Sequence, residues 1–275
     1  MKVCVIGSGG REHALAWRLS ISPSVTKVYA IPGSAAMSDC AELVGIDWQQ
    51  SDHLIRFLKD SHVDLVVVGP EAPLVAGLAD ALNAAGIPVF GPSKAAAQLE
   101  GSKVFAKDLM KKYNIPTAAY GVFHKVDEAK EFIGQTGAPI VVKADGLAAG
   151  KGVVVAMTVE EANAAVEDML SGNRFGDAGS TVVIEEFMEG EEASLLAFVD
   201  GKTVVPMIAS QDHKRIYDGD KGPNTGGMGT YAPAPVLTDA LRDEAMKTIL
   251  EPMVGAMQKK GMPYVGCLYA GLMIT

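Results

Sequence analysis

The chain is short of cysteine, of basic charge and of long apolar runs, and each shortage excludes a class of protein. Cys4, Cys40 and Cys267 stand far apart without metal-ligand spacing, which argues against a disulfide framework and a zinc site and fits a reducing cytosol. The formal net charge of −9 argues against a nucleic-acid binder. No segment has the length of a membrane span or the pattern of a secretory signal. We therefore expect a cytoplasmic protein with no nucleic-acid, membrane or obligate protein partner.

The first hundred residues alternate between strand and helix patterns, which predicts an α/β fold with a parallel sheet. Strands are expected at residues 2–6, 27–31, 64–68 and 88–90. Helices are expected at 11–20, 51–61 and 72–85. These elements make up a Rossmann-like domain, residues 1–101.

Residues 102–275 are predicted to form a second domain with an α+β lid at about residues 117–190. It starts with a basic helix, residues 102–113, whose Lys107, Lys111 and Lys112 are expected on a solvated face. After the lid we expect strands at 191–199 and 203–210, a long polar loop to 235, a helix at 238–260 and a strand at 264–274. That last apolar strand has no following partner, so a fragment with an incomplete central sheet is expected.

A glycine-rich loop between two β-branched runs is the strongest chemical signal. Val141 and Val142 precede it and residues 153–155 follow it, which predicts two strands joined by a flap whose backbone N–H groups can converge on phosphate oxygens. A Walker A loop is excluded because three residues separate Gly146 from Gly150, and Lys151 is followed by Gly152. The alternative is an ordinary glycine-containing hairpin with solvated lysines.

A second glycine-rich loop follows the first strand and opens the first helix, where amides and the helix dipole favour an anion. It is an imperfect dinucleotide fingerprint, because Glu12 stands where the third glycine is expected and the strand ending at Ile31 lacks the acidic ribose ligand. NAD is therefore disfavoured, and a smaller phosphorylated ligand is the expectation. The residues of this candidate site are Gly9, Gly10, Arg11 and Glu12.

Three polar segments supply further candidates. Pro70 and Glu71 end a strand at the carboxyl edge of the sheet, and Glu71 either faces the ligand crevice or complements a helix dipole. The acidic run at 185–192 could read an adenine edge or form a solvated turn. The long loop offers Asp212, His213, Lys214, Thr225 and Gly226, which could hold a carboxylate, a phosphate or an amine.

Together these strings resemble the glycinamide ribonucleotide synthetases, or phosphoribosylamine–glycine ligases, a family of the ATP-grasp superfamily. The resemblance rests on the opening VIGSGGREHA, on VGPEAPL, LEGSK, KADGLAAGKGV and EEF, and on DHKR followed by GPNTGGMG. It covers essentially the whole chain. It implies an amino-terminal domain that helps to bind phosphoribosylamine, and ATP held between two antiparallel sheets.

The resemblance also implies roles for individual residues. Lys103 and Lys143 are the expected phosphate contacts, with residues 146–152 as the flap. The expected ATP-binding residues are Lys103, Lys143, Gly146, Gly150, Lys151, Gly152, Glu185, Glu186 and Glu192. The expected catalytic residues are Lys143, Asp212 and Lys214. The implied reaction passes through glycyl phosphate and yields glycinamide ribonucleotide, ADP and phosphate.

The family's Mg²⁺ ligands lie on a strand beyond Thr275, so no metal ligand is expected in this chain, although ATP with Mg²⁺, or Mn²⁺, is the expected cofactor set. Alone, the 275 residues are expected to have weak or no ligase activity. Two other functions remain open. One is another ATP-grasp ligase or carboxylase, and the other is a non-catalytic ATP-binding fragment.

Overall fold

The computed structural model describes residues 1–146, 152–171, 180–219 and 221–275. The chain divides into two compact units. Unit 1 comprises Met1–Gln98 with Gly261–Gly266, and unit 2 comprises Leu99–Lys260 with Cys267–Thr275. The domain limits expected from sequence, 1–101 and 102–275, stay a prediction.

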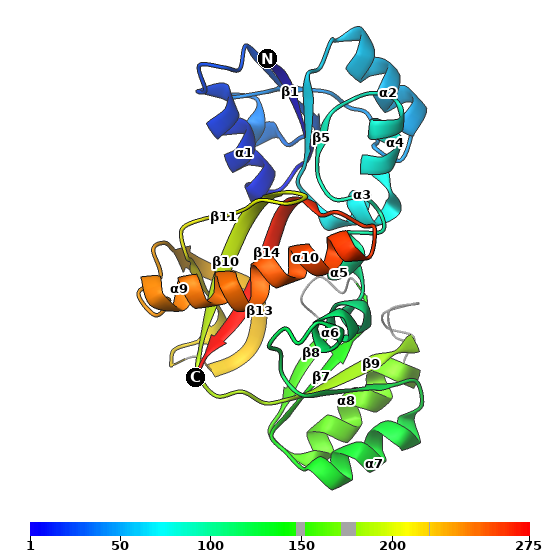
Figure 1. Ribbon diagram of the computed structural model, residues 1–275, viewed down its shortest axis with the longest axis vertical. Helices are drawn as coiled ribbons and strands as arrows, with labels where there is room; N and C mark the ends of the chain where they lie inside the picture. The colour runs from blue at the N-terminus through cyan, green and yellow to red at the C-terminus, as the bar shows by residue number, and fades with distance from the viewer. Residues whose placement is uncertain (147–151, 172–179, 220) are drawn as a thin grey trace. The chain divides into compact units, whose positions relative to one another are not determined.

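Unit 1 is built on a five-stranded parallel sheet in the order β3-β2-β1-β4-β5, which confirms the expected fold class. The strands are β1 Lys2–Gly7, β2 Lys27–Pro32, β3 Glu42–Leu43, β4 Leu65–Val68 and β5 Val89–Phe90. Successive β1 side chains enter different cores: Cys4 and Ile6 pack with Leu54 and Leu82, and Val5 packs with Ala16. The sheet is therefore covered on both faces (Figure 1).

The helices of unit 1 agree with the expected ones except at Gly77 and at a 3₁₀ turn that was not expected. They are α1 Gly10–Ser20, the short 3₁₀ turn Ala35–Met37, α2 Ser51–Asp60, α3 Glu71–Ala76 and α4 Leu78–Ala84. The single helix expected at 72–85 is wrong. Gly77 has a φ of 102°, a left-handed conformation that ends α3 and begins α4.

Unit 2 contains a four-stranded antiparallel sheet in the order β6-β9-β7-β8, here called the lid sheet. Its strands are β6 Tyr120–Phe123, β7 Ile140–Ala144, β8 Val153–Ala156 and β9 Val182–Glu186. Helices α7 Val126–Thr136 and α8 Val159–Ser171 cover one face, where Ile133 and Val166 pack against Val142 and Ile184. The two expected strands around the glycine-rich flap are confirmed, with Val142 opposite Val154.

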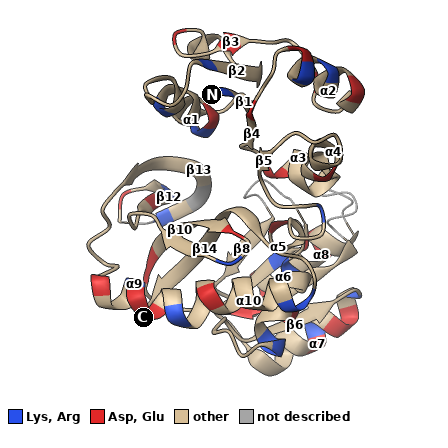
Figure 2. Cartoon of the chain, turned by 45° about the horizontal axis from the view of Figure 1, so that its top comes forward, with Lys and Arg blue, Asp and Glu red and all other residues tan. Residues whose placement is uncertain are grey.

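The helices α5 Gln98–Gly101 and α6 Lys103–Lys112 precede the lid sheet in the chain. Ser102 is the N-cap of α6, because its side chain accepts a hydrogen bond from the backbone N–H of Phe105. The lysines of α6 appear as blue bands in Figure 2.

A second sheet of unit 2 has the order β11-β10-β14, and a separate hairpin joins β12 to β13. The strands are β10 Glu191–Asp200, β11 Val204–Pro206, β12 Gln211–Tyr217, β13 Lys221–Tyr231 and β14 Val265–Ile274. The strand expected at 203–210 is therefore shorter. The long polar loop expected to residue 235 is wrong for most of its length, because its backbone pairs across β12 and β13. Glycines in β13 hide the alternation by which a strand is recognised.

The helix expected at 238–260 is confirmed in extent but not in regularity. It consists of α9 Asp239–Ala245, the π-helical segment Met246–Leu250 and α10 Glu251–Lys259. Pro252 lies just after the π-helical turn. Because proline has no N–H to donate, it accounts for a local departure from the α-helical hydrogen-bond pattern.

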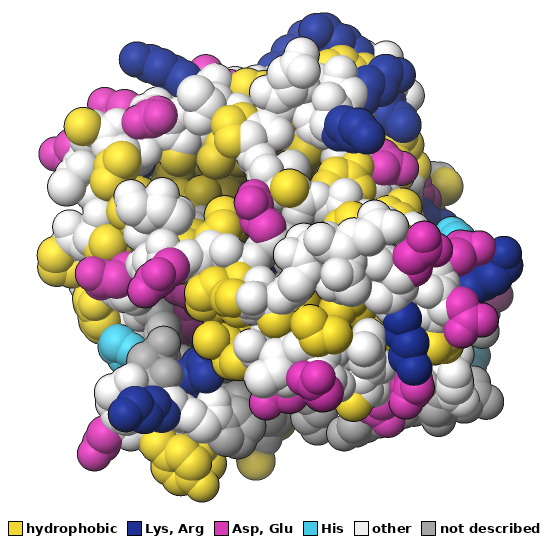
Figure 3. Space-filling model, turned by 90° about the horizontal axis from the view of Figure 1, so that it is seen from below, with side chains coloured by type: hydrophobic (Ala, Val, Ile, Leu, Met, Phe, Trp, Pro, Cys, Tyr) yellow, Lys and Arg dark blue, Asp and Glu magenta, His cyan; other side chains and the backbone are white. Residues whose placement is uncertain are grey.

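The surface drawn in Figure 3 mixes acidic, basic and apolar side chains. None of the helices in the described ranges is both long enough and apolar enough to cross a bilayer.

Candidate functional site

The glycine-rich loop of unit 1 is occupied by its own carboxylate. Glu12 is 4% exposed, and its Oε2 accepts a hydrogen bond of 2.8 Å from the backbone N–H of Gly9. A Cβ built on Gly69 would lie 2.2 Å from Oε1 of Glu12, so any larger residue there would force the Glu12 side chain to move. Glu12 thus takes the amide that a diphosphate would need, which is the physical reason why the dinucleotide fingerprint is imperfect.

Arg11 joins Glu12 to Glu71. Its Nε lies 2.8 Å from Glu12 Oε1, and its Nη1 lies 2.8 Å from Glu71 Oε1. Burial is the largest single effect and opposes ionisation of both groups. The hydrogen bonds and charges of Glu71 and Glu12 together outweigh it and raise the pKa of Arg11, and the hydrogen bonds and the charge of Arg11 together lower the pKa of Glu71. Both groups therefore stay charged. Glu71 also lies in the first turn of α3, as the helix-dipole interpretation expects, and its place in a ligand crevice stays a prediction.

A cavity of about 470 Å³ brings Gly9, Glu12 and Pro70 together, with Asp47 and Trp48 on its wall. It lies where β1 ends, at the carboxyl edge of the parallel sheet, the usual ligand position in open α/β folds. Gly10 begins α1 and has open space around it. Three of the amino-terminal candidates, Gly9, Glu12 and Pro70, therefore line one crevice within unit 1, and Arg11 connects Glu12 to Glu71.

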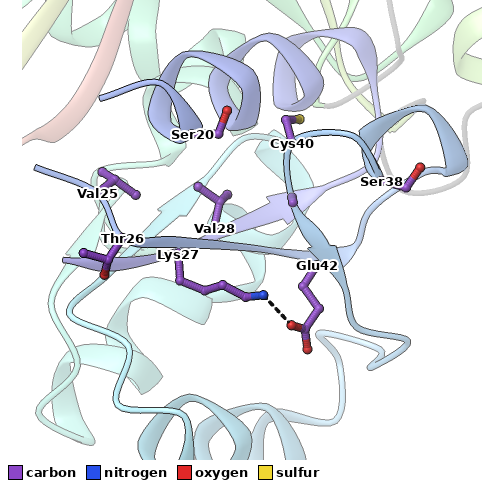
Figure 4. Close-up of a pocket in the computed structure, with 9 residues that line it drawn as sticks. Ser20, Val25, Thr26, Lys27, Val28, Ser38, Cys40 and Glu42 are labelled. Atoms are coloured by element: carbon purple, nitrogen blue, oxygen red, sulfur yellow. Dashed lines mark ion pairs between the residues drawn. The ribbon is translucent and has the colours of Figure 1, made fainter. Parts of the chain in front are cut away.

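A second hollow of unit 1, about 390 Å³ in volume, has a different character (Figure 4). Lys27 and Glu42 face each other across it at 2.7 Å. The hydroxyls of Ser20 and Ser38 donate to Trp17 and Ala35 carbonyls one turn back. Its polar groups already have partners, so we assign it no ligand.

In unit 2, Lys143 and Glu185 project from the face of the lid sheet opposite α7 and α8. They sit on neighbouring strands, and Lys143 Nζ lies 2.9 Å from Glu185 Oε2. Glu185 is buried, whereas the Lys143 side chain is 27% exposed. The structure thus brings together two predicted ATP-binding residues, as an ion pair.

Lys107 corrects the sequence-based expectation. It is buried, with Nζ 3.1 Å from Glu185 Oε2 and 2.7 Å from Thr117 Oγ1. Lys111 and Lys112 are exposed, as expected. Burial, with the nearby charge of Lys143, lowers the pKa of Lys107 against the opposing effect of Glu185. Helical spacing alone does not show which turn of α6 meets the lid sheet.

Lys103 lies at the start of α6 and reaches the loop after β7. Its Nζ donates to the Gly146 carbonyl at 3.0 Å, and its backbone N–H donates to Asp145 Oδ1 at 2.6 Å. Burial, reinforced by the positive charge of Lys143, lowers the pKa of Lys103 despite Asp145. Lys103, Lys143 and Gly146 therefore belong to one neighbourhood.

The remaining flap and hinge candidates are placed differently. Glu186 accepts a hydrogen bond from the backbone N–H of Ala119 at 2.8 Å, at the margin of the lid sheet. The Gly152 carbonyl accepts from Ala144 N–H, continuing the β7–β8 ladder by one residue. Gly150 and Lys151 lie outside the described residues.

The β12–β13 hairpin holds the last set of candidates. Lys214 Nζ lies 2.7 Å from Glu192 Oε2 and 3.6 Å from Asp212 Oδ2. These acidic partners outweigh burial, and the pKa of Lys214 is raised. Thr225 Oγ1 donates to the Lys214 carbonyl at 2.8 Å, which ties β13 to this residue.

His213 and Gly226 stand apart from that ion cluster. The ring of His213 packs against Tyr231, with centroids 5.5 Å apart. Successive strand residues face opposite sides, so His213 points away from Asp212 and Lys214. A Cβ built on Gly226 would meet no atom within 4 Å.

Sequence reasoning missed Asp145 as well as Lys107. Asp145 accepts from the backbone N–H groups of Lys103 and Val104 and from the Ser102 hydroxyl. The signal available was its place in the glycine-rich string, directly after a strand that carries a lysine.

The described ranges contain no group of three or more His, Cys, Asp or Glu residues that could hold a metal ion. Carboxylate oxygens are the protein ligands that Mg²⁺ uses. We therefore derive no chemical step through a metal ion.

Two solved structures show which fold this is. The phosphoribosylamine–glycine ligase of Thermotoga maritima superimposes with a TM-score of 0.85 and 34% identity, over 99% of this chain and 65% of that one. The biotin carboxylase domain of the Hydrogenobacter thermophilus 2-oxoglutarate carboxylase has a TM-score of 0.73 at 18% identity, over 98% of this chain and 60% of that one. The second likeness shows the fold alone.

Sequence comparison narrows the assignment. The phosphoribosylamine–glycine ligases of Brucella melitensis and Vibrio cholerae are 59% and 55% identical to the chain over its whole length. The chain spans 64% of the length of each. The family model for the phosphoribosylglycinamide synthetase N domain matches residues 1–100, and that for the ATP-grasp (A) domain matches residues 101–275. The chain therefore belongs to the phosphoribosylglycinamide synthetase family.

Proposed function

We propose that the protein containing this chain ligates glycine to 5-phosphoribosylamine with ATP, giving glycinamide ribonucleotide, ADP and phosphate in purine biosynthesis. The observation that carries the proposal is a pair of ammonium groups: Lys103 Nζ donates to the Gly146 carbonyl at 3.0 Å, in the loop that directly follows the strand carrying Lys143. Two positive charges in one neighbourhood favour the binding of a polyanion. A triphosphate between them satisfies both charges, and the family assignment supplies its identity as ATP.

The reaction needs alignment and charge neutralisation rather than a protein nucleophile. ATP phosphorylates the glycine carboxylate, and the amine of phosphoribosylamine attacks the resulting glycyl phosphate and releases phosphate. Lys103 and Lys143 counter the charge of the transferred phosphoryl group. The proposed nucleotide contacts also include Glu185, Glu186, Glu192 and the flap residues 146–152.

The remaining roles follow from the two other clusters. We propose that Gly9, Gly10, Arg11, Glu12, Pro70 and Glu71 bind phosphoribosylamine. Asp212 and Lys214, with Thr225, are proposed to orient the carboxylate and the amine, and His213 and Gly226, elsewhere on the same hairpin, are proposed as further substrate contacts. Mg²⁺, or Mn²⁺, is proposed to accompany ATP, with ligands outside the 275 residues. The three cysteines, none in a disulfide, fit the proposed cytoplasmic location.

The test uses the full-length protein with ATP, glycine and phosphoribosylamine. ADP release should require all three, and replacing glycine by bicarbonate should stop it. Lys143→Ala should lower kcat by about 100-fold or more, because a charge that stabilises the transferred phosphoryl group is lost. Lys111→Ala, on an exposed turn of α6, is the matched control. ADP release with bicarbonate and without glycine would assign a carboxylase instead.

A further inference from the structure

One oxygen of Glu185 serves two lysines. Glu185 Oε2 lies 2.9 Å from Lys143 Nζ and 3.1 Å from Lys107 Nζ. The three formal charges sum to one positive charge, because two ammonium groups share one carboxylate. In a site of reduced dielectric constant, this excess positive charge attracts an anion more strongly than it would in water.

The two lysines are not equivalent. Lys107 has a 10% exposed side chain, and its Nζ also donates to Thr117 Oγ1 and to the Ala118 carbonyl at 3.4 Å. The same Nζ lies 5.6 Å from the centroid of the Tyr120 ring. These contacts hold Lys107 in place, while the Lys143 side chain is 27% exposed. Lys143 is therefore the lysine of this pair that a ligand can reach.

We infer that Lys107 is a positioning residue of the nucleotide site: it neutralises Glu185, so that the charge of Lys143 remains available to a polyphosphate. The inference rests on the proposed function, because the polyphosphate it serves is that of ATP. Without Lys107, Glu185 and Lys143 form a closed pair of zero net charge. A phosphate then has to compete with Glu185 for the same ammonium group.

The surrounding charges agree with this role. Lys107 faces Glu185 from β9, Lys143 from β7 and the Tyr120 ring from β6, and the charge of Glu186 acts on it more weakly. The Tyr120 hydroxyl donates to Asp108 at 2.9 Å, and burial together with Asp108 raises its pKa to about 12. Tyr120 thus remains neutral at physiological pH. Glu185 is the carboxylate within ion-pair distance of both ammonium groups.

If Lys107 acts through its charge, its loss should affect some ligands more than others, which a role in packing alone would not produce. Removing Lys107 should weaken the binding of ligands with a polyphosphate and spare ligands without one. It should also act through Lys143 and Glu185, so that changes at these residues are not additive with the loss of Lys107.

The experiment measures the dissociation constants of ATP and adenosine for the full-length protein by calorimetry. We expect Lys107→Met to weaken ATP binding roughly tenfold, a change within the usual range of coupling between contacting charged residues. Adenosine binding should change less than twofold. Lys111→Met, one turn further along α6 and exposed, is the control and should alter neither constant.

A suppressor variant separates charge from packing. Glu185→Gln removes the carboxylate charge but keeps the side-chain shape, so Lys107→Met should cost much less ATP affinity in that background. In a Lys143→Met background, the loss of ATP affinity caused by Lys107→Met should also be smaller. Lys107→Arg keeps the positive charge, so its dissociation constant for ATP should lie within about threefold of the wild-type value. This variant tests the role of the charge if Lys107→Met folds poorly.

The inference is overturned if Lys107→Met weakens the binding of ATP and of adenosine equally. It is also overturned if Lys107→Met lowers ATP affinity by the same factor in the wild-type, Glu185→Gln and Lys143→Met backgrounds. An unchanged ATP constant in Lys107→Met also rejects it. A wild-type protein that binds no ATP would reject the proposed function itself, which is a distinct outcome.

Discussion

Asp145 accepts hydrogen bonds from the first backbone N–H groups of the helix that begins at Lys103, and so supplements its N-cap Ser102. Its Oδ1 accepts from the Lys103 backbone N–H at 2.6 Å, and the Lys103 side chain in turn donates to the carbonyl of Gly146 at 3.0 Å. The loop after β7 thus accepts two hydrogen bonds from Lys103, one from its backbone and one from its side chain. This contact keeps Lys103 in the neighbourhood of Lys143.

Asp145→Ala should therefore reduce both stability and nucleotide affinity. Loss of an N-terminal cap costs about 1 kcal/mol of unfolding free energy, and here a second amide, that of Val104, loses its partner too. Urea unfolding measures the first effect, and calorimetry with ATP measures the second. Asp127→Ala, in the exposed first turn of α7, is the control. Unchanged ATP affinity would show that the cap does not position Lys103.

Gly77 and Gly134 should respond oppositely to alanine. Gly77 has a φ of 102°, so Gly77→Ala should lower the unfolding free energy by about 1–2 kcal/mol. Gly134 lies inside α7 with no atom within 4 Å of a built Cβ, so Gly134→Ala should raise it by roughly 0.5–1 kcal/mol. Denaturant unfolding of the two variants measures both changes in unfolding free energy. Equal effects would contradict the assigned helix break.

Cys4 should resist alkylation across the physiological pH range. Burial raises the pKa of Cys4 to about 12, so about one thiol in 10,000 is ionised at pH 8, and Cys4 is also inaccessible. The reactive thiolate forms only as the pH approaches the pKa. Because pH 9 is still well below the pKa of Cys4, raising the pH from 7 to 9 should leave native Cys4 unmodified.

Cys40 is the internal comparison, because it is only partly buried and lines the hollow in Figure 4. Burial, assisted by Asp39, raises the pKa of Cys40 as well, so its alkylation by iodoacetamide should be slow and should accelerate with pH. Site-specific mass spectrometry measures both residues, and unfolded protein should react at both. Rapid labelling of native Cys4 would contradict its place in the core.

Much of the secondary structure follows from local pattern. The β-branched runs of β1, β2 and β4, alternating with helical segments, indicate a parallel sheet, because a strand buried on both faces reads as a continuous apolar run. The two strands flanking the flap are visible in the same way. Pattern failed at Gly77 and in β13, where glycine permits a backbone state without leaving a side chain to reveal it.

The sequence by itself determined the family, the two glycine-rich loops and which lysines and carboxylates are available for chemistry, since residue types and short-range spacing are local properties. Only the tertiary structure decided how these groups pair. Lys103, Lys107 and Lys111 follow one another at intervals of four along α6, so periodicity places them on one stripe. Packing against the lid sheet buries Lys107 beside Glu185 and leaves Lys111 in solvent, because burial depends on contacts between segments far apart in the chain.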